Sequence, residues 1–318
     1  MASVAEKKSL RRPSTFFHLA LPASSANLGP AFDAAALAVD IFLRIQARVA
    51  QDARFSIKAS GRDPSVCERI ENNLILNTYR EVLEAEGREV APLSLRIRNE
   101  IPIGKGCGSS AAARLAGIAP AVHFGRLKWS DARMIGEASR REGHPDNAAA
   151  CWMGGLAVAR MSGEADAQIA NIRPKGKWPL LLAVPEKSLS TEEARRVLPA
   201  QYSRADAVAN IQNSMLLLAA FAQGRHPLLT TVLADRIHQP YRAVLCPLLP
   251  CLQKLNGTSG VLGVALSGAG PSVLLFLDPK VPAHKTYKTV AAHLAGHNLG
   301  AELLVASISQ RGGRPQRP

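Results

Sequence analysis

A loop rich in glycine and serine, placed between a strand-like and a helix-like segment, limits most strongly what this chain can fold into. The segment SLRIRNEIPIG alternates apolar and polar residues as a half-buried strand does, and SSAAARLAGIA begins a helix, so residues 104–110 lie at a helix N-terminus. Unpaired backbone N–H groups and the positive end of the helix dipole stabilise a phosphate at such a position. The loop therefore predicts an anion site, to which the hydroxyls of Ser109 and Ser110 could contribute.

Three kinds of loop share this composition. A Walker A loop has lysine directly after its last glycine, whereas Gly108 is followed by Ser109 and the lysine, Lys105, comes earlier. The run from Gly106 to Ala111 fits the relaxed dinucleotide pattern GxGxxA, but HFGRLKWSD stands where a second strand should end in an acidic residue. An ordinary glycine-rich turn into a helix is the third reading of the loop taken alone.

Strand and helix signals recur on both sides of the polar segment SGEADA at residues 162–167. With 318 residues and 47% apolar content, the chain is long enough for two cores. We therefore expect an α+β protein with domains at residues 15–165 and 166–310. No apolar run is long enough to span a membrane, and the five cysteines lack paired CxxC spacing, which together predict a cytoplasmic protein with reduced thiols and no membrane partner.

The net charge of +14 raises the question of nucleic-acid binding. Residues 1–14 and 311–318, which we expect to be disordered basic tails, account for six of the fourteen charges. Aromatic residues make up only 5% of the chain, and no basic run alternates with stacking residues. We therefore expect no nucleic-acid partner, and a non-catalytic nucleic-acid-binding protein is kept as the alternative from a different functional class.

Three segments in a fixed order resemble the motifs of the GHMP kinases, which include galactokinase, homoserine kinase, mevalonate kinase and phosphomevalonate kinase. IPIGKGCGSSAAA resembles the nucleotide-binding motif with Cys107 in place of the usual leucine, PASSANLGPAFDAAALAVD resembles the first motif, and LSGAGPSV resembles the third. Within that family, SANLGPAFD, EGHPDNAAA, STEEARRVLP and DRIHQPYR resemble segments of the homoserine kinases. The likeness covers about residues 17–276.

This resemblance implies a two-lobed GHMP kinase fold, with an N-terminal domain like the second domain of ribosomal protein S5 and a ferredoxin-like C-terminal domain. It implies the Mg²⁺-dependent transfer of phosphate from ATP to the hydroxyl of L-homoserine, which gives O-phospho-L-homoserine in threonine biosynthesis. A kinase of this family that acts on another small carboxylated alcohol is the alternative. The resemblance is also compatible with a homodimer.

The family motif assigns nucleotide binding to the loop and to the start of the following helix. By resemblance the residues are Pro102, Gly104, Lys105, Gly106, Cys107, Gly108, Ser109, Ser110, Ala111 and Ala112. In the third motif, the backbone of Gly268, Ala269 and Gly270 would lie beside substrate and phosphate, although a tight turn between two strands explains this segment equally well in isolation. Pro120 lacks an N–H group and should kink or end the helix that begins at Ser109.

Other motif positions are expected to bind the amino acid. By resemblance they are Asn27, Asp33, His144, Arg195, Arg242 and Gly270, and Thr191 and Arg195 are expected to be catalytic. The planar fork of arginine matches a carboxylate, which agrees with two arginines gripping the carboxylate of the substrate. The plainer alternatives are that Asp33 caps a helix beginning near Ala34 and that Arg195 is an exposed helix residue.

The turn EGHPDN raises the question of the catalytic base. In relatives like mevalonate kinase an aspartate base occupies the slot that corresponds to Asn147, and an amide cannot take that part. The resemblance therefore implies that positioning and electrostatics carry most of the catalysis, with Asn147 at the active site. Turn and cap chemistry is an equally good explanation for Asp146.

The expected magnesium site departs from the family pattern. The glutamate that holds Mg²⁺ commonly lies eleven residues before the Asn147 slot, where this chain has Gly136 followed by Glu137. A shift of one residue rotates a helical side chain by about 100°. We expect Ser109 and Glu137 to hold the metal if a local irregularity restores Glu137, and otherwise a group such as Glu142.

Overall fold

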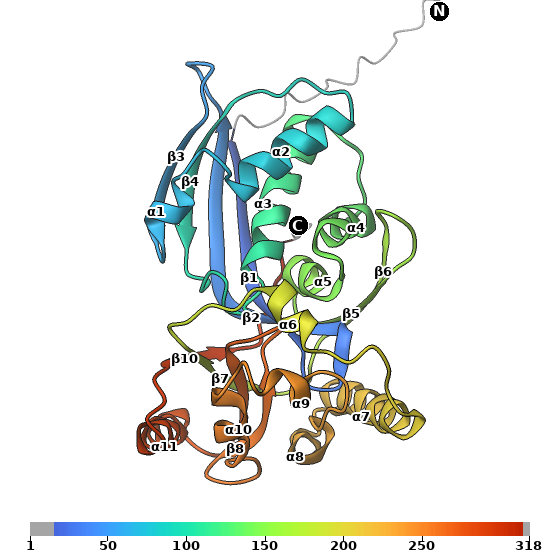
Figure 1. Cartoon of the computed structure of the whole chain (residues 1–318). Helices are drawn as coiled ribbons and strands as arrows, with labels where there is room; N and C mark the ends of the chain where they lie inside the picture. Colours follow the sequence, from blue (N-terminus) through green and yellow to red (C-terminus); the bar gives the residue numbers. More distant parts are fainter. Residues whose placement is uncertain (1–15, 314–318) are drawn as a thin grey trace, which may run out of the picture.

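The computed structural model describes residues 16–313 and arranges them in two lobes, each built on its own β-sheet (Figure 1). The first sheet has the strand order β3-β4-β2-β5-β6, with β1 paired to β2, and the second has the order β10-β7-β9-β8. Helices accompany both sheets, which confirms the expected two-lobed α+β fold. The expected tails at residues 1–14 and 314–318 lie outside the described residues.

The first lobe is organised around one long antiparallel hairpin. Its strands are β1 (Phe16–Asn27), β2 (Ala31–Val49), β3 (Ser56–Gly61), β4 (Leu93–Asn99), β5 (Leu156–Met161) and β6 (Ala167–Ile172). The segment after Asp33 is therefore strand, and the reading of Asp33 as a helix cap is wrong. Pairing with β1, β4 and β5 and the full burial of residues 35–39 outweigh the helix propensity of their alanines.

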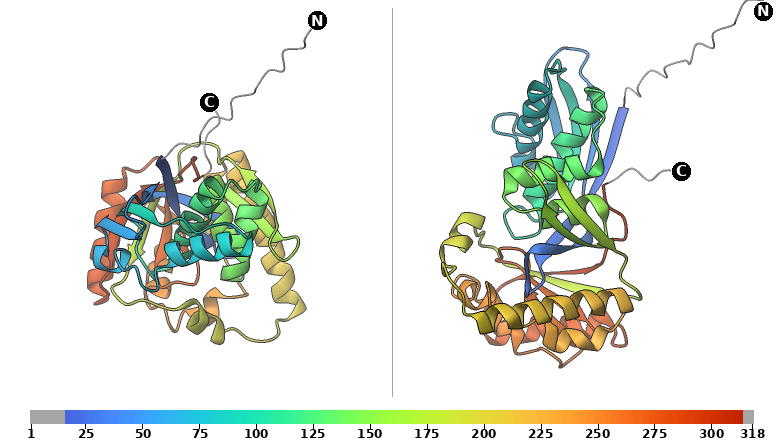
Figure 2. Two further views of the ribbon diagram at one scale, coloured as in Figure 1. Left: turned by 90° about the horizontal axis from the view of Figure 1, so that it is seen from above. Right: turned by 90° about the vertical axis from the view of Figure 1, so that its right-hand side faces the viewer.

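Helices cover this sheet in two layers (Figures 1 and 2). They are α1 (Pro64–Cys67), α2 (Leu74–Ala85), α3 (Ser109–Phe124), α4 (Asp131–Glu142) and α5 (Asp146–Met153). Helices α3 and α5 pack on β1 and β2, and α2 and α4 pack against α3. Helix α3 continues for four residues beyond Pro120, so of the two expected effects, a kink or an end, the end is wrong. A proline at this position removes only its own hydrogen bond, and the surrounding burial keeps the last turn helical.

The second lobe has the strands β7 (Pro179–Val184), β8 (Val261–Leu266), β9 (Val273–Leu277) and β10 (Glu302–Ser307). Its helices are α6 (Thr191–Arg196), α7 (Arg204–Gln223), α8 (Leu229–Val232), α9 (Gln239–Arg242), α10 (Leu248–Gln253) and α11 (Ala283–Gly296), with a short 3₁₀ helix at His226–Leu228. The helices lie between β7 and β8 and between β9 and β10, and all neighbouring strands are antiparallel. This strand–helix order with this sheet order is the ferredoxin-like arrangement that was expected.

The two lobes share a hydrophobic core. Leu180 and Leu182 of β7 enter the core that continues into the first lobe, whereas Leu181 and Ala183 enter a second core beneath α10 and α11. Alternate residues of one strand point to opposite faces, so the second sheet is buried on both sides. All five cysteines are free thiols, and none of the helices formed by residues 16–313 has the length and apolar content that crossing a membrane requires.

The chain passes between the lobes twice. Strand β6 pairs antiparallel with β5, so the change of sheet falls between Ile172 and Pro179, one strand later than the boundary expected after residue 165. After β10 the chain returns to the first lobe, where Ile308 bridges Val39. The N–H group of Gly313 donates to the carbonyl of Cys151 at 2.9 Å, so residues 311–313 of the expected C-terminal tail are packed against the first lobe.

Candidate active site

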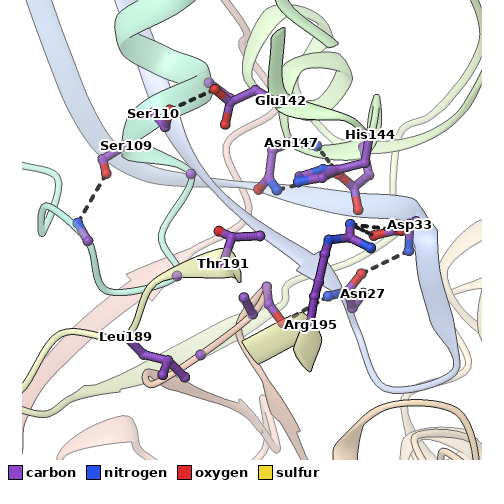
Figure 3. A pocket seen from close by; sticks show the side chains of 18 of the residues that line it. Asn27, Asp33, Ser109, Ser110, Glu142, His144, Asn147, Leu189, Thr191 and Arg195 are labelled. Atoms are coloured by element: carbon purple, nitrogen blue, oxygen red, sulfur yellow. Dashed lines mark hydrogen bonds and ion pairs between the residues drawn. The ribbon is translucent and has the colours of Figure 1, made fainter. Parts of the chain in front are cut away.

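A pocket of about 110 Å³ lies between the lobes, where the loop before α3 faces the β8–β9 loop and α6 (Figure 3). It brings together residues that are up to 243 positions apart in the chain, from Asn27 to Gly270. The predicted site residues that line it are Asn27, Asp33, Gly104, Gly106, Gly108, Ser109, Ser110, Ala111, His144, Asn147, Thr191, Arg195, Arg242 and Gly270. Glu142, Asp146, Leu189, Gly268 and Ala269 complete its wall.

The N-terminus of α3 forms the end of the pocket that suits a phosphate. Gly104, Gly106 and Gly108 all have positive φ angles, of 68°, 78° and 70°, and Gly108 is the N-cap residue. No side chain of the described residues caps this 16-residue helix, so its first N–H groups are left for a ligand. The helix dipole adds positive potential at the same place.

The glycines of this loop also allow the three sequence motifs to meet. A Cβ atom on Gly106 would lie 2.3 Å from the carbonyl oxygen of Ser267, and one on Gly108 would lie 1.9 Å from Oγ of Ser24. The Ser267 hydroxyl donates to the Gly106 carbonyl at 2.8 Å, and Gly268 N–H donates to Ala26 at 3.0 Å. These contacts therefore hold three segments in position relative to one another, which are β1, the loop before α3 and the β8–β9 loop.

Four residues of the predicted nucleotide motif do not line this pocket: Pro102, Lys105, Cys107 and Ala112. The ammonium group of Lys105 donates to the backbone carbonyl of Glu186 in the second lobe. The side chain of Cys107 is buried, and burial raises the pKa of its thiol to about 12. Cys107 thus fills core space, as the usual leucine would, and any contact of these four residues with a nucleotide stays a prediction.

Glu142, rather than Glu137, is the glutamate at the phosphate end. Glu137 is buried on α4 and accepts hydrogen bonds from Arg140 at 2.8 Å and Arg141 at 3.0 Å, away from the pocket. Helix α4 is regular over both glutamates, so nothing compensates for the one-residue shift, and the expected pairing of Glu137 with Ser109 is not formed. Oε1 of Glu142 instead accepts from the hydroxyl of Ser110 at 2.7 Å and from Arg114.

The opposite end of the pocket is built from charged and amide side chains of the β1–β2 turn and α6. Nη2 of Arg195 lies 2.9 Å from each carboxylate oxygen of Asp33 (Figure 3). Asn27 accepts from the N–H of Asp33 at 2.9 Å and donates to the carbonyl of Gly268 at 2.8 Å. Asn27 and Asp33 have φ angles of 72° and 54°, a strained conformation that is often found at functional positions.

Helix α6 explains why Thr191 and Arg195 act together. Ser190 caps the helix by accepting from the N–H of Glu193 at 3.1 Å, and this cap fixes the residue at which α6 begins. Thr191 and Arg195 are four residues apart and so share one face, which lines the pocket. The alternative of Arg195 as a merely exposed helix residue does not account for its ion pair with Asp33.

Arg242 is a buried cation at the same end. It is only 1% exposed, its Nε donates to the carbonyl of Ala194 at 3.0 Å, and its Nη1 donates to the carbonyl of Gly268 at 3.4 Å. The ring of Phe32 lies 5.2 Å from its guanidinium and 5.5 Å from that of Arg195. Burial and the neighbouring charge of Arg195 lower the pKa of Arg242, and among the described residues no carboxylate forms an ion pair with it.

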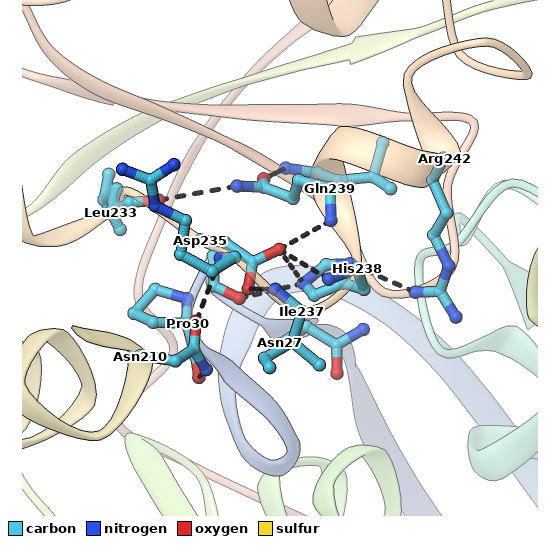
Figure 4. A network of polar contacts seen from close by, with 12 residues as sticks. Asn27, Pro30, Asn210, Leu233, Asp235, Ile237, His238, Gln239 and Arg242 are labelled. Atoms are coloured by element: carbon cyan, nitrogen blue, oxygen red, sulfur yellow. Dashed lines mark hydrogen bonds and ion pairs between the residues drawn. The ribbon is translucent and has the colours of Figure 1, made fainter. Parts of the chain in front are cut away.

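A network that the sequence did not predict holds Arg242 in place (Figure 4). Both carboxylate oxygens of Asp235 accept backbone N–H bonds at the start of α9, including that of His238 at 2.9 Å. Nε2 of His238 donates to the carbonyl of Gly29 at 2.8 Å, so Nδ1 accepts from Arg242 at 3.2 Å. Burial lowers the pKa of His238 and keeps the ring neutral. An Asp three residues before a His, in DRIHQPYR, was the available signal.

The turn EGHPDN places three polar side chains in the middle of the pocket. Nδ1 of His144 is hydrogen-bonded to Oδ1 of Asp146 at 2.7 Å, and Oδ1 of Asn147 accepts from Ser24 at 2.8 Å. Oδ2 of Asp146 is buried without a partner among the described residues. Burial alone would lower the pKa of His144, but the hydrogen bond and charge of Asp146 outweigh it, so this pKa is raised.

A second and larger pocket, of about 980 Å³, adjoins the first at Gly104, Ser109 and Ser110. It lies between α1, α2, β4 and α3 and is lined mainly by aliphatic side chains, which are Leu43, Val66, Ile70, Leu74, Ile75, Ile97, Ile101 and Ile103. Polar and charged residues complete the lining, which are Glu68, Arg69, Glu71, Asn72, Asn73 and Asn99. No motif predicted this pocket, because most of its wall comes from segments that contain no recognisable motif.

Comparison with known proteins identifies the family of this chain. The model of the GHMP kinases N terminal domain matches residues 73–155. A homoserine kinase of Solibacter usitatus is 41% identical over 298 residues, which cover 94% of this chain and 96% of that protein. A homoserine kinase of Synechococcus is 32% identical and covers 92% of this chain and 95% of that protein.

The solved structure of a homoserine kinase from Cytophaga hutchinsonii superposes with a TM-score of 0.80, at 24% identity and 98% coverage of both chains, and shows the same two-lobed fold. These relatives are kinases, and they give no support to the alternative of a non-catalytic nucleic-acid-binding protein. The sequence likeness over nearly the whole chain therefore shows that this protein belongs to the homoserine kinase family of the GHMP kinases.

Proposed function

We propose that this protein transfers the γ-phosphoryl group of ATP to the hydroxyl of L-homoserine, releasing ADP and O-phospho-L-homoserine for threonine biosynthesis. One observation carries the proposal. Within residues 16–313, a single pocket has a helix N-terminus that no side chain caps at one end and a buried arginine without a carboxylate partner at the other. The first suits phosphate and the second suits a carboxylate, so the pocket is matched to a nucleotide facing a carboxylated alcohol.

The amino acid would lie at the charged end. Arg242 and Arg195 would bind its carboxylate, and Asp33 would exchange part of its ion pair with Arg195 for the ammonium group. This exchange favours an amino acid over a hydroxy acid that has no ammonium group, because the latter would leave Asp33 and Arg195 with only each other. The alternative of another small carboxylated alcohol is thereby narrowed to other hydroxy amino acids.

The nucleotide would extend from the first pocket into the second. Its phosphates would be bound by the N–H groups at the start of α3, and its base would enter the aliphatic pocket that meets the loop at Gly104 and Ser109. A mostly apolar cavity with a few amide groups is the usual environment of a cofactor base. Asn72 at its wall could select the base by hydrogen bonding, whereas the amide of Asn73 already caps α2.

The residues at the phosphate end fit a magnesium ion. Mg²⁺ prefers oxygen ligands from one or two carboxylates together with substrate phosphates, and Glu142 and the hydroxyls of Ser109 and Ser110 line this part of the pocket. When bound, the ion would neutralise charge on the transferred phosphate. Glu142 is therefore the residue that we assign to the metal, in place of Glu137.

The chain's own groups would act mainly by positioning. Asn147, fixed by the hydroxyl of Ser24, would orient the substrate hydroxyl, since an amide cannot accept its proton. His144, held by its hydrogen bond to Asp146, would present its other ring nitrogen beside the reacting groups, and Thr191 offers a hydroxyl from the opposite wall. Such an arrangement suits a loose phosphoryl-transfer transition state, which needs alignment and charge more than a strong base.

A coupled assay of ADP release tests the proposal. With Mg-ATP, L-homoserine should give ADP well above the hydrolysis measured without acceptor, and phosphorus NMR should show a phosphomonoester of homoserine. Arg195→Ala should raise the KM for homoserine by about 100-fold with little change for ATP. Arg196→Ala, an exposed neighbour on the same helix, is the matched control and should behave as wild type. Faster turnover of another hydroxy amino acid, or no ADP with any acceptor, would contradict the assignment.

Two further features of the family remain proposals for this chain. We infer that the reaction takes place in the cytoplasm, which is supported by the five free cysteines, since thiols persist in reducing compartments. A homodimer is also expected, and light scattering of the purified full chain would distinguish it from a monomer.

A further inference from the structure

Three potential metal ligands meet on the second lobe, outside both pockets. Cys251 lies on α10, His293 lies on the neighbouring helix α11, and His297 is the C-cap residue directly after α11 (Figure 1). One ring nitrogen of each histidine and the sulfur of Cys251 all lie within 4.8 Å of one another. None of the three residues lines the candidate active site, so the cluster is not explained by the kinase reaction.

The helices place these side chains in a fixed arrangement. His293 and His297 are four residues apart and therefore share one face of α11, with their ring centroids 4.4 Å apart. Nε2 of His293 donates to the backbone carbonyl of Cys251 at 3.0 Å, which ties the ring to α10. Nδ1 of His297 donates to the carbonyl of His293 at 2.8 Å.

These hydrogen bonds also decide which ring nitrogens can bind a metal. A carbonyl only accepts, so each bonded nitrogen carries the proton, and the other nitrogen of each neutral ring keeps a free lone pair. Histidines that bind metals usually donate their second N–H group to a carbonyl or carboxylate in this way. Each ring thus makes one hydrogen bond of this kind and keeps its second nitrogen for a metal.

We propose that Cys251, His293 and His297 bind one divalent transition-metal ion of the zinc type, which cross-links α10 and α11. Two imidazoles and a thiolate suit zinc, whereas Mg²⁺ and Ca²⁺ require oxygen ligands. Ligands in a tetrahedral zinc site lie roughly 3.5 Å apart, so the donors need to approach by about 1 Å. The exposed side chain of His297 can supply that movement, and water would fill the fourth position.

A metal that binds Cys251 has to displace the proton of its thiol. Cys251 is buried, and burial raises the pKa of this thiol, which opposes that displacement. Zinc binding would release this proton, and affinity would increase with pH. The ion would stabilise the packing of α10 against α11 in the second lobe, because it binds the folded arrangement and not the unfolded chain.

Cobalt is the probe for this site because its spectrum reports the ligands. The full chain without an affinity tag, stripped with a chelator, should bind one equivalent of Co²⁺ and show a thiolate-to-cobalt charge-transfer band. Zn²⁺ should displace the cobalt, and it should raise the melting temperature by roughly 3 °C. Cobalt binding without a thiolate band, or no binding at micromolar concentrations, would overturn the proposal.

Variants identify the ligands. Cys251→Ser should abolish the charge-transfer band, and His297→Ala should weaken metal affinity by about 10-fold or more. His284→Ala, an exposed histidine at the start of the same helix, is the matched control and should bind as wild type. His297 is exposed, so its variant remains informative even if Cys251→Ser does not fold. Unchanged affinity in His297→Ala, or an equal loss in His284→Ala, would exclude this set of ligands.

Discussion

The two ends of the active-site pocket are built from different chemistry. At the phosphate end the ligand meets backbone: glycines with positive φ angles, the uncapped start of α3, and one glutamate that is already bonded to Ser110 and Arg114. At the amino-acid end it meets charged side chains, of which Arg195 is paired with Asp33 and Arg242 is buried without a carboxylate partner in the described chain. One end is specified by shape and the other by charge.

This difference teaches how each end can change. A site made of backbone depends on whether the chain can follow a certain path, so it is sensitive to any added side chain and indifferent to many changes of charge. A buried charge without a counter-ion lowers the stability of the free protein, because it is poorly solvated there. Binding of a ligand with the opposite charge offsets this loss. Substitutions at the two ends should therefore fail in different ways.

The largest effect is expected from Arg242. Arg242→Ala should lower kcat/KM for L-homoserine by about 10³-fold, because it removes the buried positive charge that faces the substrate carboxylate, and should change the KM for ATP little. Steady-state kinetics with each substrate varied would measure this. Arg242→Lys keeps the charge without the planar fork, so its kcat/KM for L-homoserine should lie between those of wild type and Arg242→Ala.

A matched control separates this effect from unfolding. Arg236 is exposed and lies on the same connecting segment, so Arg236→Ala should leave both KM values unchanged. Equal losses for ATP and homoserine in Arg242→Ala would mean that the residue supports the fold through Ala194 rather than the carboxylate.

The next largest effect concerns the backbone end. Gly106→Ala should reduce the free energy of unfolding by about 3 kcal/mol or more, because the new Cβ would lie 2.3 Å from one carbonyl oxygen and 2.7 Å from another. Gly104→Ala has a similar φ angle, but its nearest neighbour would be the Ser188 hydroxyl at 3.5 Å, so only about 1 kcal/mol should be lost. Chemical denaturation of both variants checks the contrast, and equal losses would refute the close-approach explanation.

A smaller effect should distinguish the two glutamates of α4. Glu142→Gln should raise the Mg²⁺ concentration needed for half-maximal binding of an ATP analogue by about 10-fold, because a carboxylate ligand becomes a neutral amide. Glu137→Gln should leave this concentration unchanged, since its carboxylate faces Arg140 and Arg141. Calorimetric titrations at several Mg²⁺ concentrations give the comparison without relying on turnover, and the reverse order would restore Glu137 to the metal.

The smallest effect is the pH dependence of stability at the centre of the pocket. The pKa of His144 is raised in the folded state, so its contribution is complete below the unfolded pKa of about 6.5 and is lost as pH rises through the folded value. Denaturation curves from about pH 6 to about pH 8 should therefore decline less steeply for His144→Asn than for wild type. The pKa of His238 is lowered, so its contribution to stability is instead lost as pH falls. If the free energy of unfolding of His144→Asn declined with pH as steeply as that of wild type, His144 would not be the source of this pH dependence.

The phosphate end could be located from local sequence rules, whereas the residues of the amino-acid end were predicted only through the family resemblance, and this difference has a physical reason. The strand, loop and helix at residues 93–124 are contiguous, so local rules of glycine, capping and periodicity apply to them directly. Arg242 is also held by the ring of Phe32 and the carbonyl of Ala194, which only tertiary structure brings to it. Long-range packing of this kind leaves no spacing to read.

The individual differences have the same origin. The sequence spacing gives the direction of the Glu137 side chain around the helix axis relative to its neighbours. It does not give the face of α4 that meets the pocket, because that face depends on how Gly136 packs against the backbone at Ala165. Similarly, strand β2 contains a run of alanines that favours a helix locally, and its pairing with β1 decides otherwise. The aliphatic second pocket has no motif at all, because many combinations of apolar residues would form it.

The return of the chain from β10 to the first lobe has a consequence for synthesis. A ribosome adds residues in order, so β1 to β6 emerge long before residues 308–313, which hydrogen-bond to Ala38 and Cys151 and pack on Trp152. The lobe that is translated first therefore receives its final segment only after the other lobe has been made. Nascent chains that stop before Ile308 would leave this surface of the first lobe uncovered.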